Sequence, residues 1–170
     1  MKYIGCVLIL LLGSISMAAV PAQKPAMKIT KILAGEGSTF GGIAGSGFTL
    51  LDVRRTADAK KKLERIVIDV GDINGAPKRG WPGYYFAELK KNPQKLIMDF
   101  SQMPNARINQ AQIAARLKNS TAIRQTAMSM DPTDSSLILS WDLKPNTKVR
   151  VYQVAGTKST SKVVIDLQAQ

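Results

Sequence analysis

The most regular feature of this sequence is a short alternation of polar and apolar positions that recurs along the chain. Each copy has a basic residue, three apolar residues, an aspartate and a further apolar residue, at positions 65–70, 95–100 and 162–167. Residues 137–143 form a looser copy. Because side chains alternate between the two faces of a strand, three apolar residues of each strict copy share one face. These are Ile66, Ile68 and Val70; Leu96, Met98 and Phe100; and Val163, Ile165 and Leu167. We predict that these faces meet in a common core.

The opposite face of each copy carries the basic residue and the aspartate. In neighbouring antiparallel strands these side chains would pair across the strands. Exposed pairs of this kind contribute about 0–1 kcal/mol each, so they would set the register more than the stability.

The copies fall into two similar halves, residues 64–100 and 135–167. Each half has three strands, and turns are expected at Asn92-Pro93, Pro145-Asn146 and Gly156. Two such halves predict a mainly β fold: a two-sheet antiparallel sandwich with an approximate internal repeat. Further strands are expected at 27–33 and 47–55. One short helix is expected over 108–118, with Asn109 as its N-cap.

Two segments interrupt this pattern with turn-forming residues. Residues 34–47 contain six glycines among fourteen, which predicts a mobile loop. Phe40 stands where a dinucleotide-binding GxGxxG pattern needs glycine, and a strand follows where that pattern needs a helix, so nucleotide binding is disfavoured. Residues 71–83 form the longest other irregular stretch.

The N-terminus has the three parts of a secretory signal peptide. Lys2 precedes an apolar run from Ile4 to Leu12, and small residues at Ser16 and Ala18 allow cleavage after residue 18, or as late as residue 22. We expect a flexible leader at 19–26 and a single β domain at 27–170. The apolar run is too short for a membrane span, so we expect a periplasmic or secreted protein without one.

The net charge limits the classes of partner that we expect for such a protein. The chain has 24 Lys and Arg against 12 Asp and Glu, and removal of the signal peptide leaves 23 basic residues and a net charge of +11. A surplus of this size attracts polyanions. Anionic wall glycan fits an exported protein, whereas nucleic acid fits the charge but not the location.

Composition argues against enzymatic chemistry. The sequence has no histidine, and its one cysteine, Cys6, lies in the signal peptide. Histidine-dependent triads, imidazole metal sites and thiolate sites are therefore excluded, and we expect no catalytic residues, metal or cofactor. Four aspartates at strand ends, Asp69, Asp99, Asp142 and Asp166, are expected to accept hydrogen bonds rather than act as acids.

The best binding candidates lie near the loop at 71–83. Trp81, Tyr84 and Tyr85 offer aromatic rings that stack on sugars, and Lys78 and Arg79 offer cations that hold carboxylates or phosphates. Adjacent strand residues face opposite ways, so one of the two tyrosines is expected in the core.

Several segments resemble the AMIN domain. Residues 88–100 (Glu-Leu-Lys-Lys-Asn-Pro-Gln-Lys-Leu-Ile-Met-Asp-Phe) resemble its Asn-Pro to Asp segment, and 122–125 (Ala-Ile-Arg-Gln) its following Ile-Arg strand. Residues 137–143 and 162–167 resemble its closing strands. The resemblance implies a β-sandwich that targets peptidoglycan for wall amidases and pilus secretins, here in a stand-alone form. By this motif Arg124 is a further ligand candidate; a salt bridge with a strand-end aspartate is the alternative.

Together these features predict an exported envelope-binding module that attaches to peptidoglycan or a related anionic wall glycan. Two alternatives remain open. The protein could serve as an interaction or assembly factor for a pilus or secretion apparatus, or as a secreted inhibitor of a wall-degrading enzyme.

Overall fold

The computed structural model describes residues 30–33, 36–45, 47–157 and 160–169. The signal peptide, Cys6, the leader and the first three residues of the strand expected at 27–33 lie outside the described residues. In chain order the elements are β1 (Thr30–Leu33), β2 (Gly37–Gly41), β3 (Phe48–Asp58), β4 (Leu63–Asp72), β5 (Tyr85–Lys90), β6 (Lys95–Phe100), β7 (Asn105–Ala106), α1 (Gln110–Leu117), β8 (Ile123–Asp131), β9 (Ser136–Leu143), β10 (Lys148–Val154) and β11 (Ser161–Gln168).

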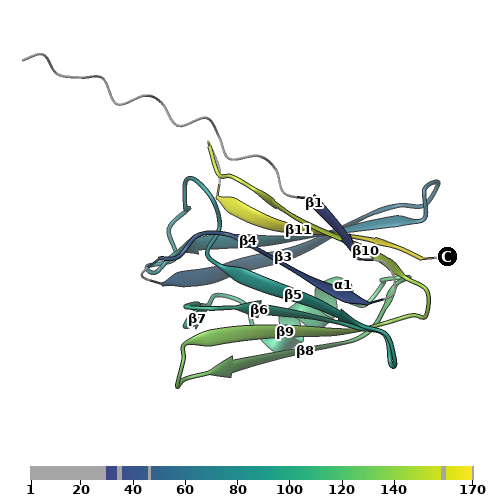
Figure 1. Ribbon diagram of the computed structural model, residues 1–170. Coiled ribbons are helices and arrows are strands. Elements are labelled where there is room, and N and C mark those ends of the chain that lie inside the picture. The colour runs from purple at the N-terminus through teal and green to yellow at the C-terminus, as the bar shows by residue number, and fades with distance from the viewer. Residues whose placement is uncertain (1–29, 34–35, 46, 158–159, 170) are drawn as a thin grey trace, which may run out of the picture.

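The strands form two sheets that lie face to face (Figure 1). The larger sheet, sheet A, has the order β1-β10-β11-β4-β3-β7, and the smaller, sheet B, has the order β2-β5-β6-β9-β8. All neighbouring strands are antiparallel except the short pair β3 and β7. The chain is therefore mainly β, and the predicted two-sheet sandwich is confirmed.

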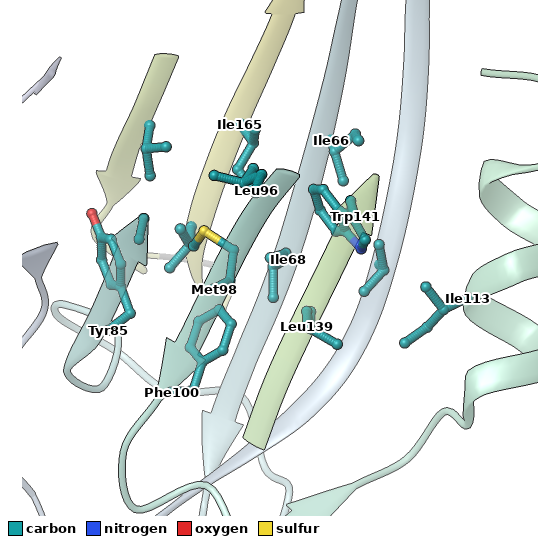
Figure 2. Packing of buried hydrophobic residues seen from close by; sticks show 14 of the residues in the cluster. Ile66, Ile68, Tyr85, Leu96, Met98, Phe100, Ile113, Leu139, Trp141 and Ile165 are labelled. Carbon is teal, nitrogen blue, oxygen red and sulfur yellow. The ribbon is translucent and has the colours of Figure 1, made fainter. Parts of the chain in front are cut away.

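The repeated segments supply the centre of both sheets. The first and third copies, in β4 and β11, are direct neighbours in sheet A, and the second copy and its looser relative, in β6 and β9, are neighbours in sheet B. Each half of the sequence thus contributes strands to both layers. All nine apolar residues predicted to face inward are fully buried. Figure 2 shows several of them packed around Trp141 and Tyr85.

The predicted cross-strand charge pairs form between the first and third copies, but not at Asp99 of the second copy, which lies opposite Ile138 and whose Oδ1 atom has no hydrogen-bond partner among the described residues. Arg65 donates two hydrogen bonds to Asp166, over 2.7 and 3.0 Å, and Lys162 lies 3.4 Å from Asp69 on the same two strands. Because each copy has a base at its first position and an acid at its fifth, antiparallel pairing of two copies brings opposite charges together. In sheet B, the Lys95 ammonium lies 3.1 Å from an Asp142 carboxylate oxygen.

Helix α1 closes one side of the sandwich. It lies within the range expected from the sequence, and Asn109 caps it in a capping box with Gln112. The helix contacts one strand of each sheet, β3 of sheet A and the edge strand β8 of sheet B, and Figure 2 shows Ile113 pointing from it toward the core. No helix among the described residues is both long and apolar enough to cross a membrane.

The glycine-rich segment differs from the mobile loop that we predicted. Residues 37–41 form β2, the edge strand of sheet B, paired along its length with β5. Gly42 then turns the chain with a φ of +86°, and a Cβ atom there would lie 2.1 Å from the carbonyl oxygen of Gly83. Some of these glycines therefore allow close backbone contact rather than mobility.

Candidate functional site

The loop that carries most of the predicted binding residues joins the two sheets. Residues 73–84 run from the end of β4 in sheet A to the start of β5 in sheet B. Gly80 and Gly156 exchange two backbone hydrogen bonds, of 2.9 and 2.7 Å, and the Ser161 amide donates to the Lys78 carbonyl over 2.9 Å. The loop is therefore held against the turn between β10 and β11 at several points.

The two tyrosines face opposite ways, as strand alternation requires. Tyr85 is only 2% exposed, and its ring centroid lies 6.2 Å from that of Phe100 in the core. Burial raises the pKa of the Tyr85 hydroxyl to about 12. The expectation that Tyr85 faces a ligand is therefore corrected, and Tyr84 is the outward member of the pair.

Tyr84 forms an exposed ring pair with a residue that the sequence analysis did not select. The ring centroids of Tyr84 and Phe40 lie 6.4 Å apart, with an interplanar angle of 29°. Tyr84 is 39% exposed, Phe40 65% and the nearby Ile43 42%. Phe86 is the cross-strand partner of Phe40. We call this group (Phe40, Ile43, Tyr84 and Phe86) the aromatic face.

Backbone contacts between distant segments create this face. The Ile43 amide donates to the Pro82 carbonyl over 3.0 Å, and the Tyr84 amide donates to the Ile43 carbonyl over 2.9 Å. Gly83, between the two, lies so close to the Phe48 ring that an added Cβ would be 2.3 Å from it. The glycine-rich segment and the loop at 73–84 thus meet where only small residues fit.

One carboxyl group lies beside the aromatic face on the same side of sheet B. Asp99 is the cross-strand partner of Phe86, which places Phe40, Phe86 and Asp99 in one row across β2, β5 and β6. Its Oδ1 atom is buried and has no hydrogen-bond partner among the described residues. Burial raises the pKa of Asp99, and the nearby Asp134 raises it further. The row therefore combines apolar rings with a polar atom that lacks a protein partner.

The remaining loop residues have different environments. Lys78 is half-buried, and its ammonium lies 5.4 Å from the centre of the Phe48 ring, a cation–π contact. Arg79 is exposed and Trp81 is half-buried. Lys78, Arg79, Trp81 and Tyr84 thus all lie on this loop. Of the four, Tyr84 is the one whose ring stacks on another exposed ring, that of Phe40.

Arg124 is not part of this group. It lies at the other end of sheet B, where Gln125 pairs with Asp142 and Asp142 pairs with Lys95. Tyr85 pairs with Phe100, five residues further along β6, a separation of about 17 Å at about 3.4 Å per residue. Arg124 makes no salt bridge with a carboxylate of the described chain, so the structural alternative for it is not found. It lines a separate hollow instead.

Phe40 is the functional candidate that sequence reasoning missed. Its segment was interpreted as a loop because glycines flank it, and pairing of that segment with β5 depends on contacts with residues more than forty positions away. A large aromatic residue among six glycines was the one available signal.

Comparisons with known proteins add no family assignment. No protein-family model matches this chain, and a search of curated proteins also finds no match. The resemblance to the AMIN domain therefore stays a prediction.

Proposed function

We propose that this protein is an exported, non-catalytic module that attaches to peptidoglycan or a related anionic wall glycan. The observation that carries the proposal is the exposed, stacked pair of Phe40 and Tyr84 on the outer side of sheet B. The N-terminal signal pattern and the resemblance to the AMIN domain support the same function.

The aromatic face has the chemistry that sugar rings need. The C–H-bearing face of a pyranose packs on aromatic rings, and its hydroxyl groups need hydrogen-bond partners at the edge of the contact. Phe40 and Tyr84 provide the rings. Asp99, on the neighbouring strand β6, places a half-buried carboxyl group in the same row.

Binding to isolated peptidoglycan sacculi tests this proposal. The purified protein without its signal peptide should co-sediment with sacculi, and Phe40→Ala and Tyr84→Ala should each weaken binding about tenfold, the equivalent of about 1.4 kcal/mol. Met130→Ala is the matched control, because Met130 is 43% exposed on the far edge strand β8. Trp81→Ala tests whether the half-buried indole contributes.

Two results would contradict the proposal. The wild-type protein could remain in the supernatant at every salt concentration, or the Phe40 and Tyr84 variants could bind as well as the Met130 variant. Circular dichroism of each variant would show that the sandwich is intact, since both side chains lie outside the core.

A second function, assembly with an envelope protein, is favoured by one feature of sheet B. Strand β8 is an edge strand. The Thr126 carbonyl accepts from the Gln110 side chain, but the following residues 127–130 (Ala-Met-Ser-Met) carry no charge that would prevent another strand from pairing there. Ser129→Lys should abolish such pairing and leave sacculus binding unchanged, and size-exclusion chromatography with a candidate partner would detect the difference.

A further inference from the structure

Arg124 lies in a hollow that is formed by two turns and lined by cations. The turn between β5 and β6 and the turn between β9 and β10 enclose about 370 Å³. Lys91, Arg124 and Lys148 line this hollow, and no aspartate or glutamate does. All three cationic side chains belong to exposed residues. The hollow therefore has a positive lining with no acidic group of its own.

The floor of this hollow is fixed by a buried amide. The Gln94 side chain donates to the Thr147 carbonyl over 2.6 Å and accepts from the Thr147 amide over 3.2 Å. The Leu143 amide donates to the Gln94 carbonyl over 2.8 Å. These bonds join the two turns, so the backbones that carry Lys91 and Lys148 are held in place relative to each other.

A second hollow continues the positive surface onto sheet A. It encloses about 720 Å³ and shares Lys148 with the first, and its other cations are Lys61, Arg65 and Arg150. The one carboxylate in its lining, Asp166, is bound by the two hydrogen bonds from Arg65. We call the surface formed by Lys61, Lys91, Arg124, Lys148 and Arg150 the cationic groove.

Most of these cations have no acidic partner. Lys91, Arg124, Lys148 and Arg150 form no ion pair with any carboxylate of the described residues, and Lys61 has only a loose pair with Asp58, at 3.7 Å. Like charges gathered on one surface repel each other and raise the energy of the folded state. An anionic ligand would remove this repulsion.

We propose that the cationic groove binds a linear glycan polymer that carries oxyanions, carboxylate or phosphate, at intervals along its length. The groove extends through two hollows that share Lys148, which suits several anions on one chain better than one isolated ion. Arginine binds both oxyanions through two parallel hydrogen bonds, and Lys91 and Lys148 add positive charge to the same hollow.

The cationic groove deepens the proposed envelope function but is a separate site from the aromatic face. Arg124 and Tyr84 lie at opposite ends of sheet B. Binding of a neutral sugar depends on the rings and is insensitive to salt, whereas binding of the polyanion depends on the cations and weakens as salt increases. The two proposals therefore succeed or fail independently.

Binding of three defined polymers tests the inference. Oligogalacturonate supplies carboxylates on a glycan, linear polyphosphate supplies phosphates without sugar, and a neutral chito-oligosaccharide supplies sugar without charge. The test variant is Arg124→Gln. The matched control is Arg107→Gln, which also removes one exposed arginine and lies outside the cationic groove.

We expect the wild-type protein to bind oligogalacturonate, measured by calorimetry at 50 mM NaCl, and to lose most of this binding at 300 mM. The groove variant should bind about tenfold more weakly than the control variant, because it lacks a cation that binds the oxyanions of the polymer directly. Both variants should bind the neutral oligosaccharide like the wild type. Tighter groove-dependent binding of polyphosphate would support the site and identify phosphate as its preferred oxyanion.

Two outcomes would overturn the inference. Equal losses in the groove and control variants would mean that the polymer responds only to the overall charge of the protein. Failure of the wild-type protein to bind either polyanion at 50 mM NaCl would mean that the groove is not a polyanion site, whatever the result with the neutral oligosaccharide.

Discussion

The side-chain amide of Gln94 is bound to both backbone groups of Thr147, a residue 53 positions later in the chain. Gln94 immediately precedes β6 of sheet B, and Thr147 immediately precedes β10 of sheet A. This buried amide therefore joins the two layers at the end of the sandwich where Arg124 lies.

Replacement of Gln94 should destabilise the protein. Gln94→Ala leaves the buried Thr147 carbonyl without this partner and the Thr147 amide with only its long bond to the Lys144 carbonyl, at 3.4 Å, a cost of about 1–3 kcal/mol. Urea denaturation followed by circular dichroism would measure the loss. The exposed Gln125 provides the control, and a Gln94→Ala loss no larger than that of Gln125→Ala would show that the amide is not a structural link.

Because of Glu64, the free energy of unfolding should decrease at low pH. Burial alone would raise its pKa, but hydrogen bonds from Arg55, Ser120 and Thr121 outweigh burial and lower the pKa from 4.5 to about 2. Because the pKa is lower in the folded state, the contribution of Glu64 is fully present above about pH 4.5. It is lost as the pH falls toward 2. The shift corresponds to about 3 kcal/mol.

Urea denaturation of the wild-type protein and Glu64→Gln between pH 7 and pH 2 checks this prediction. The wild type should be more stable at pH 7, and the difference between the two proteins should shrink as the pH falls below 4.5. Glu88→Gln is the control, because Glu88 has an exposed side chain that only approaches Lys90, at 3.6 Å. A constant difference over the whole range would contradict the assignment.

The pair Arg65 and Asp166 should show energetic coupling. Arg65 donates two hydrogen bonds to a carboxylate that is only 6% exposed, although Arg65 itself is about half exposed. A double-mutant cycle with Arg65→Ala and Asp166→Ala should give a coupling energy of about 1 kcal/mol that falls as salt is added. The more exposed pair Lys95 and Asp142 should give less. Equal coupling in the two pairs would show that burial of Asp166 has no influence.

Replacement of Gly83 should lower both the stability of the protein and binding at the aromatic face. A Cβ atom at this position would press against the Phe48 ring, so Gly83→Ala should cost about 1–3 kcal/mol and displace the adjacent Tyr84. Gly80→Ala provides the contrast, since Gly80 has a positive φ but no atom within 4 Å of an added Cβ. Thermal denaturation should show a loss for both variants, and sacculus binding should weaken only for Gly83→Ala. Normal sacculus binding by the Gly83 variant would show that the position of Gly83 does not affect the aromatic face.

The sequence alone was sufficient for the central strands of both sheets, their inward-facing residues and the charge pairs between β4 and β11. Which residues face inward can be predicted within each copy, at 65–70, 95–100 and 162–167, because alternation along a strand depends only on neighbouring positions. The end charges of each copy also predict antiparallel pairing, and Arg65 with Asp166 confirms it. Helix α1 was predictable for the same reason, since the capping residue and the two buried positions lie within nine residues of chain.

Tertiary structure decided where the candidate sites lie. Strand β2 exists because β5 is beside it, and Phe40 reaches Tyr84 only through that pairing. The cationic groove likewise needs turns from distant parts of the chain to meet around Arg124 and Lys148. Local patterns specify which face a side chain takes, whereas the distance between two side chains depends on how whole strands are ordered in the sheets. The sequence therefore determined the layers, and only the fold determined which of their surface residues stand together.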